Sequence, residues 1–137
     1  MEIEYRINDL ISVEEVIDVL ERSGLAERRP VDDKDCIAGM IDNCNLLVTA
    51  KKDGLLVGVA RSLTDFHYAC YLSDLAVDKS CQSQGIGIEL QRQTQAQLGP
   101  HCKLILIAAP KANGYYPKIG FMNNPNCWVI KADQKIG

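Results

Sequence analysis

The residues best suited to chemistry form a glycine-bearing turn between an apolar run and a segment of helical periodicity. The apolar run is Tyr71–Val77, and the turn follows within Gln82–Gly87. A strand, a turn and a helix in this order present several backbone N–H groups to one anion, and the helix N-terminus adds partial positive charge. Gly85 and Gly87 lack the side chains that would hold a ligand away from those amides. The pattern predicts a site for a phosphate or diphosphate, and so for a cofactor that carries one.

Composition limits the kind of protein that holds this turn. The chain has 137 residues, is 47% hydrophobic and carries a net charge of −3, so we expect one globular domain over residues 1–137 without the basic surface of a nucleic-acid-binding protein. It contains no apolar run of about 18 residues, which excludes a spanning helix, and no signal peptide at the start. We expect a cytoplasmic protein with no nucleic-acid or membrane partner.

The cysteines do not indicate a metal site. No two of them form a C-x-x-C pair, and only His67 and His101 are available to assist as ligands, so the sequence predicts no metal. A disulfide framework is not expected in a chain of this size and class. Most of the thiols are predicted to be small buried hydrophobes, with Cys81 partly exposed in the glycine turn.

The first half of the chain predicts a strand followed by two helices. Residues 3–7 alternate between apolar and polar types, which indicates a half-buried strand. Ser12 and Glu15 form the capping box of a helix that Gly24 ends. A second helix is expected at about residues 33–42.

The second half supplies most of the predicted sheet. The Asp53-Gly54 step indicates a hairpin between two strands. The remaining elements are two strands around a central helix, then a short helical segment and a last strand, giving the order β-α-α-β-β-β-α-β-α-β. The strands are expected at 46–51, 55–63, 69–77, 103–109 and 128–130, with the central helix at 85–98. Because residues 103–109 are nearly all apolar, that strand is predicted to be covered on both faces.

A second motif points to a family. Tyr115-Tyr116-Pro117-Lys118-Ile119-Gly120-Phe121 follows the glycine turn after the central helix and an apolar strand. With both motifs in this order, the chain resembles the GNAT superfamily of acyl-CoA-dependent N-acetyltransferases. The resemblance implies a single-domain α/β (α+β) fold, in which helices flank a mixed, mostly antiparallel sheet splayed between its fourth and fifth strands. A nucleotide-binding loop is a poorer interpretation, because the turn lacks a Gly-Lys-Ser/Thr sequence.

The resemblance also implies a cofactor and the residues that bind it. Acetyl-CoA would be the co-substrate, and no metal would be needed. Backbone amides of the turn would hold the pyrophosphate, at Gln82, Ser83, Gln84, Gly85, Ile86 and Gly87. The end of the preceding strand, at Leu75, Ala76 and Val77, would pair with the pantetheine arm.

Tyr116 is the implied general acid. A phenol is protonated at neutral pH and can donate its proton to the departing CoA thiolate. The alternative is an ordinary core tyrosine with its hydroxyl satisfied. Because Pro117 and Gly114 disfavour a continuous helix here, the segment could instead form two short turns.

Asp74 is the candidate base for the acceptor amine, and Ser73 stands where some small-sugar acetyltransferases of the family have a glutamate. Side chains alternate along a strand, so Ser73 and Asp74 are expected to point to opposite faces. If Ser73 faces the site, the amine would lose its proton to water and Asp74 would be structural. Phe66, Tyr68 and Ser73 are the candidate substrate-binding residues. The two aromatic side chains could flank the amine, or they could belong to an ordinary turn.

The expected activity is acetyl transfer to the primary amine of a small molecule by direct attack. Two alternatives remain open: a non-catalytic acyl-CoA-binding module, and an acetyltransferase acting on a protein or peptide amine. A homodimer is possible through the strand containing Trp128, because an exposed sheet edge invites pairing.

Overall fold

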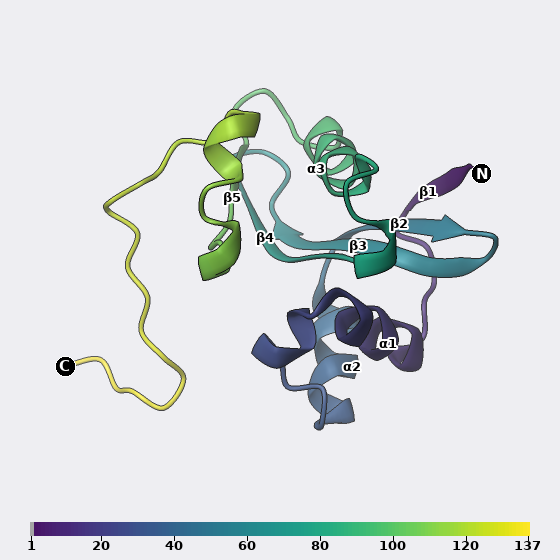
Figure 1. Cartoon of the computed structure of the whole chain (residues 1–137). Helices are drawn as coiled ribbons and strands as arrows, with labels where there is room; N and C mark the ends of the chain where they lie inside the picture. Colours follow the sequence, from purple (N-terminus) through teal and green to yellow (C-terminus); the bar gives the residue numbers. More distant parts are fainter. Residues whose placement is uncertain (1) are drawn as a thin grey trace. The chain divides into compact units, whose positions relative to one another are not determined.

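The computed structural model describes residues 2–137 and contains a five-stranded sheet with three α-helices (Figure 1). The strands are β1 (Ile3–Ile7), β2 (Leu46–Lys52), β3 (Leu55–Thr64), β4 (Ala69–Val77) and β5 (Lys103–Ile105). The helices are α1 (Val13–Ser23), α2 (Lys34–Asn43) and α3 (Ile86–Ala96). The strands lie in sequence order, and every pair is antiparallel except β4 and β5, which are parallel. The predicted mixed, mostly antiparallel sheet is confirmed.

Local signals in the sequence set the ends of α1. The Ser12 hydroxyl accepts a hydrogen bond from the Glu15 N–H, and the Glu15 carboxylate accepts one from the Ser12 N–H, each at 3.0 Å. Gly24 ends the helix in the left-handed conformation, with φ of 87°. The capping box and the glycine stop are therefore both confirmed.

Two hydrophobic clusters pack on opposite faces of the sheet. One joins α1 and α2 to it through Val16, Val19, Leu20, Ile37, Leu47, Leu56, Val59 and Ala76. The other joins α3 through Val48, Ala50, Val57, Ala60, Leu72, Cys81, Ile86 and Leu90. Figure 1 shows α1 and α2 on one side of the sheet and α3 on the other. Burial of these apolar side chains is the main force that holds the helices to the sheet.

Gly58 lets α3 approach the sheet closely. A Cβ atom at this position would lie 3.1 Å from Leu90 Cδ1 and 3.2 Å from Ile86 Cγ2. Both side chains are fully buried, so any larger residue would push the start of α3 outward. The helix that follows the glycine turn is thus seated directly on the backbone of β3.

The connection between β3 and β4 is organised by Asp65. Its Oδ1 accepts hydrogen bonds from the N–H groups of Tyr68, Ala69 and His67 at 2.8, 3.0 and 3.0 Å. These three bonds stabilise the carboxylate and lower the pKa of Asp65 to about 2.

Replacing Asp65 by asparagine is expected to make the free energy of unfolding depend less steeply on pH in the acid range. A carboxyl group whose pKa is lowered on folding stabilises the protein above its unfolded pKa of about 4, and this stabilisation is lost as the pH falls toward 2. Urea unfolding at several pH values between these limits should show that the free energy of unfolding falls less steeply with decreasing pH for Asp65→Asn than for the native chain. Asp32→Asn, at an exposed aspartate, is the control. A slope identical to the native one in Asp65→Asn would contradict this assignment.

Residues 108–137 form a compact unit separate from the rest of the chain. They contain two 3₁₀-helices, η3 (Pro110–Ala112) and η4 (Tyr116–Ile119). The α-helix predicted in this segment is therefore wrong, and the alternative of two short turns is confirmed. Pro110, Gly114 and Pro117 prevent a continuous helix. Whether this unit and residues up to Ile107 make one domain stays a prediction.

The end of the predicted sheet also differs. Among the described residues, 128–130 form no strand, and Trp128 is 89% exposed. An extended segment needs a partner strand for its backbone groups, and no described strand pairs with this one. Strand β5 is three residues long rather than seven, and Ile105 and Ile107 are partly exposed. The prediction that it is covered on both faces is wrong.

The six cysteines are all free. Cys70 and Cys81 are buried, Cys36 and Cys127 are exposed, and the other two are half-buried. The predictions that most thiols are buried and that Cys81 is partly exposed are both wrong. Cys81 is covered because it packs into the cluster beneath α3. No helix in residues 2–137 has the length and apolar character needed to cross a bilayer.

Candidate functional site

Strand β4 carries an irregularity at Ser73. Arg61 of β3 pairs with Asp74, while the next residue, Ser62, pairs with Leu72, so Ser73 is an extra residue in the ladder. Such a β-bulge breaks the alternation of side chains along the strand. Leu72 therefore packs in the cluster under α3, whereas Ala76 packs in the cluster under α1. The bulge lies in the middle of the strand that leads to the glycine turn.

Two arginines surround Asp74 at this bulge. Arg29 Nε donates to one carboxylate oxygen at 2.6 Å, and Arg61 Nε donates to the other at 2.5 Å. Arg61 also donates to the Ser73 hydroxyl at 3.0 Å, and Arg29 donates to the Ser73 carbonyl at 2.7 Å. The side chain of Asp74 is only 3% exposed. We call Arg29, Arg61, Ser73 and Asp74 the bulge cluster.

The bulge cluster corrects one prediction. Because the side chains of Ser73 and Asp74 both contact the same guanidinium group, they do not point to opposite faces as expected. Arg29 and Arg61 were not predicted from the sequence as site residues. The available signal was Arg61 itself, the one charged residue of a mostly apolar strand, whose charge needs a partner when it is buried.

The sheet opens beyond the bulge, as predicted for the fourth and fifth strands. β5 pairs with β4 only over Ala69–Tyr71. Among the described residues, no strand pairs with β4 on this side from Leu72 to Val77. The backbone groups along this free edge are available to an extended ligand, in the manner of an added β-strand. Leu75, Ala76 and Val77 lie at the end of it.

The glycine turn follows at the C-terminal end of β4. Ser83 and Gly85 adopt left-handed backbone angles, with φ of 66° and 80°, and Gly85 is the N-cap of α3. Within the described part of the chain, the N–H groups from Ser83 to Ile88 donate to no protein acceptor. Gln82 differs, because its N–H is directed at the Lys79 carbonyl at 3.5 Å. A run of unpaired amides at a helix N-terminus suits an anion.

The start of this turn is anchored by Asp78. Its carboxylate accepts hydrogen bonds from the backbone N–H and the hydroxyl of Ser80, each at 2.8 Å, and pairs with Arg22 of α1. Burial acts to raise the pKa of Asp78, but the bonds from Ser80 and Arg22 outweigh it and lower that pKa overall. The turn is thus fixed at its first residues and leaves the later amides open.

Tyr116 belongs to the unit formed by residues 108–137. Its ring makes edge-to-face contacts with Tyr115 and Phe121, with centroids 5.1 and 5.4 Å apart. Pro117 occupies the first turn of η4, where a missing N–H is tolerated, and Gly120 ends it with φ of 105°. Burial, with a smaller effect from Tyr115, raises the pKa of Tyr116. Its phenol therefore stays protonated through neutral pH, as a general acid requires.

Phe66 and Tyr68 lie at the opposite end of β4 from the glycine turn. Tyr68 precedes Ser73 by five residues, which is about 16 Å along an extended strand. Its ring lies under the ammonium group of Lys103, 3.4 Å from the ring centroid, and the Phe66 carbonyl accepts a bond from the Gly99 N–H at 2.8 Å. The structure does not bring either ring next to Ser73.

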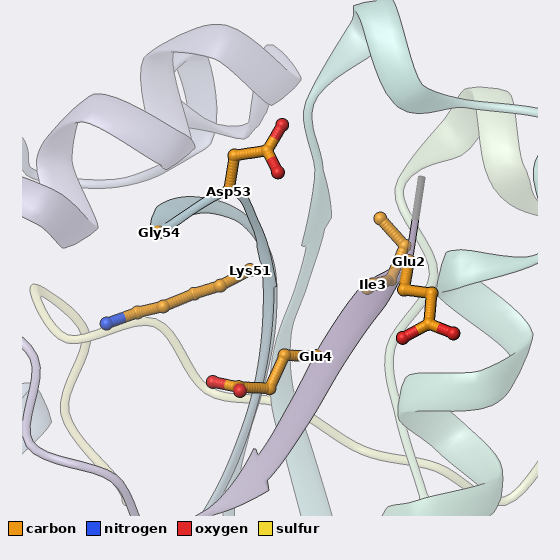
Figure 2. A pocket seen from close by; sticks show the side chains of 6 residues that line it. All are labelled: Glu2, Ile3, Glu4, Lys51, Asp53 and Gly54. Carbon is orange, nitrogen blue, oxygen red and sulfur yellow. The ribbon is translucent and has the colours of Figure 1, made fainter.

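A recess of about 460 Å³ lies elsewhere, beside β1 and the hairpin between β2 and β3 (Figure 2). Its lining consists of Glu2, Ile3, Glu4, Lys51, Asp53 and Gly54. Three carboxylates make it unsuitable for a diphosphate, and it shares no residue with the glycine turn or the bulge cluster. Among residues 2–137, no three His, Cys, Asp or Glu side chains are grouped to hold a metal ion.

Comparison with protein families agrees with this geometry. A family model described as an acetyltransferase (GNAT) domain matches residues 18–127. The match covers most of the chain, including β4, the glycine turn and the tyrosine motif. The chain therefore belongs to the GNAT acetyltransferase family. No curated protein matches the sequence significantly.

Solved structures share the fold at low sequence identity. A probable acetyltransferase from meticillin-resistant Staphylococcus aureus aligns with a TM-score of 0.74 at 21% identity, over 95% of this chain and 99% of that one. A predicted acetyltransferase from Clostridium acetobutylicum, solved with acetyl-CoA, gives 0.71 at 14% identity over 95% and 96%. The aminoglycoside N-acetyltransferase AAC(6')-Iy in complex with CoA gives 0.72 at 15% identity over 97% and 96%. The predicted fold class is confirmed.

Proposed function

We propose that this protein is an N-acetyltransferase that moves an acetyl group from acetyl-CoA to the primary amine of a small molecule. The observation that carries the proposal is the run of unpaired amides from Ser83 to Ile88 at the end of a strand whose edge is free. A ligand with a diphosphate and an extended amide-containing arm matches both features. Acetyl-CoA and CoA accompany two of the solved structures that share this fold.

In the proposed reaction, the neutral amine nitrogen attacks the thioester carbonyl carbon directly. The tetrahedral intermediate then collapses, the C–S bond breaks, and the sulfur leaves as a thiolate. Tyr116 gives its phenolic proton to that thiolate, and the nitrogen loses its extra proton to water. The Tyr116 phenolate then takes a proton back from solvent, which restores the acid for the next turnover. The products are the N-acetylated amine and free CoA. A phenol is protonated at neutral pH, so Tyr116 can hold its proton until negative charge builds on sulfur. Burial raises the pKa of Tyr116, so the phenol gives up its proton only to a group as basic as the departing thiolate.

We propose a structural role for Asp74 rather than the role of a base. Both of its oxygens already accept hydrogen bonds from arginines, and the side chain is buried. A base must reach the proton that it removes, and this geometry gives Asp74 no such access. Deprotonation of the amine through water, the alternative that followed from a site facing Ser73, is the mechanism that we retain.

A free-thiol assay with acetyl-CoA and a panel of amines tests the proposed function. The panel should contain aminosugars, polyamines, aryl-alkyl amines and short peptides with a free N-terminus. We expect amine-dependent thiol release with at least one small amine, and an acetylated product of the corresponding mass. Release with peptides alone would favour a protein acceptor. Binding of CoA without release by any amine would favour a non-catalytic acyl-CoA-binding module.

A further inference from the structure

Arg29 links two parts of the chain that are far apart in sequence. It follows the 3₁₀-helix η1 (Leu25–Arg28) in the connection between α1 and α2, and its guanidinium group reaches β4. It makes two different contacts there: Nε donates to the Asp74 carboxylate, and Nη2 donates to the Ser73 carbonyl. One planar side chain therefore holds both residues of the bulge.

Arg61 holds the same two residues from β3. Its Nε donates to Asp74 and its Nη2 donates to the Ser73 hydroxyl, while its Nη1 donates to the Met40 carbonyl of α2 at 3.2 Å. Arg61, on β3, thus contacts two other elements, β4 and α2. Arg29 is more accessible, with a side chain 22% exposed, compared with 8% for Arg61. Arg29 is the member of the bulge cluster that can be changed with the least disturbance of the core.

The bulge determines the course of the free edge of β4. Before the bulge, the side chain of Leu72 packs on the face of the sheet covered by α3. After the bulge, the side chain of Ala76 packs on the face covered by α1. A shift of the bulge would turn the backbone groups between Leu72 and Val77, which are those open to a ligand. The unpaired amides of the glycine turn begin at Ser83, ten residues after Ser73, and are anchored separately by Asp78.

We propose that Arg29 is a positioning residue for acyl transfer: its two-pronged contact with Ser73 and Asp74 fixes the part of β4 beside which the thioester reacts. This inference rests on the proposed function. It predicts that the affinity for CoA and the rate of acyl transfer depend on different contacts. The diphosphate would be held by the turn, whereas the alignment of the acyl group would depend on the bulge. Small errors in the alignment of reacting groups reduce turnover strongly.

Arg29→Lys is the decisive variant. A lysine keeps the positive charge beside Asp74, but a single ammonium group does not reproduce the planar fork that also bonds the Ser73 carbonyl. We expect kcat for acetyl transfer to fall about 10-fold or more, with the calorimetric Kd for CoA within about twofold of the native value. Arg29→Ala should lower kcat at least as much. Arg28→Ala, at the exposed neighbouring arginine, should change neither quantity.

Hydrogen exchange of the backbone amides gives a second readout. In Arg29→Lys with bound acetyl-CoA, the amides of Ser73, Asp74 and Leu75 should exchange faster than in the native complex, while those of Gly85 and Gly87 keep their protection. If both Arg29 variants had the kcat and the amide exchange rates of the native protein, the inference would be overturned and the proposed function would stand. A parallel loss of CoA affinity, kcat and thermal stability would show a general structural role and would also overturn it. Failure of the native protein to bind CoA would overturn the proposed function and this inference together.

Discussion

Asp74→Asn is expected to lower the free energy of unfolding by about 3–5 kcal/mol, because it leaves the buried guanidinium group of Arg61 and the half-buried one of Arg29 without their anion. Arg29 and Arg61 both bond the Asp74 carboxylate, and its side chain is 3% exposed. An asparagine can accept through one oxygen only, and its NH₂ group would face an arginine. Urea unfolding monitored by circular dichroism measures the loss.

Asp18→Asn is the matched control for this prediction. Asp18 pairs with Arg22 on α1 and is 54% exposed, so the cost of removing its charge should stay below about 1 kcal/mol. An Asp74→Asn variant of native stability that has lost turnover, with a changed pH profile of kcat/KM, would contradict the structural role. Such a result would restore Asp74 as the base.

Tyr116→Phe is expected to lower kcat about 100-fold or more, since removal of a general acid typically costs between 10² and 10⁴ in rate. Phenylalanine retains the ring that contacts Tyr115 and Phe121, so the fold of this segment should be preserved. The affinity for CoA should also be preserved, because the lost group acts on the departing sulfur. Steady-state kinetics with the best amine and calorimetry with CoA measure the two quantities.

Tyr115→Phe provides the comparison at the neighbouring ring. It removes a hydroxyl group from the same motif, and we expect kcat within a few-fold of the native value. Equal losses in the two variants, or a loss of CoA affinity equal to the loss of kcat in Tyr116→Phe, would count against the acid role. An unchanged kcat in Tyr116→Phe would exclude that role.

Local sequence signals predicted most of the fold. The bounds of β1 and β4 agree with those read from the sequence, and Ser12, Glu15 and Gly24 set α1 as expected. These features depend on residues close together in the chain, where hydrogen-bond chemistry and periodicity are informative. The glycine turn was predicted for the same reason.

The bulge cluster could not be predicted in this way. Its members come from β3, β4 and the connection between α1 and α2, and the bulge at Ser73 is a property of the pairing between β3 and β4 rather than of either strand. Simple alternation therefore assigned Ser73 and Asp74 to opposite faces. The predicted last strand failed for a related reason, since Trp128 and its neighbours form a strand only when a partner strand is present.

The central claim, that the amides of the glycine turn bind the diphosphate of CoA, is tested most directly by calorimetry on Gly87→Ala and Gly39→Ala. A methyl group at Gly87 would meet only Val77 Cγ2 at an ordinary 3.7 Å, and one at Gly39 would meet nothing within 4 Å. Both positions are helical, so both changes should leave stability unchanged or raise it by about 0.5–1 kcal/mol. We predict that the native chain and Gly39→Ala bind CoA with equal affinity, whereas Gly87→Ala binds it at least about 10-fold more weakly because the methyl group obstructs the phosphates. Equal CoA affinity in all three proteins, or no CoA uptake by the folded native chain, would contradict the account.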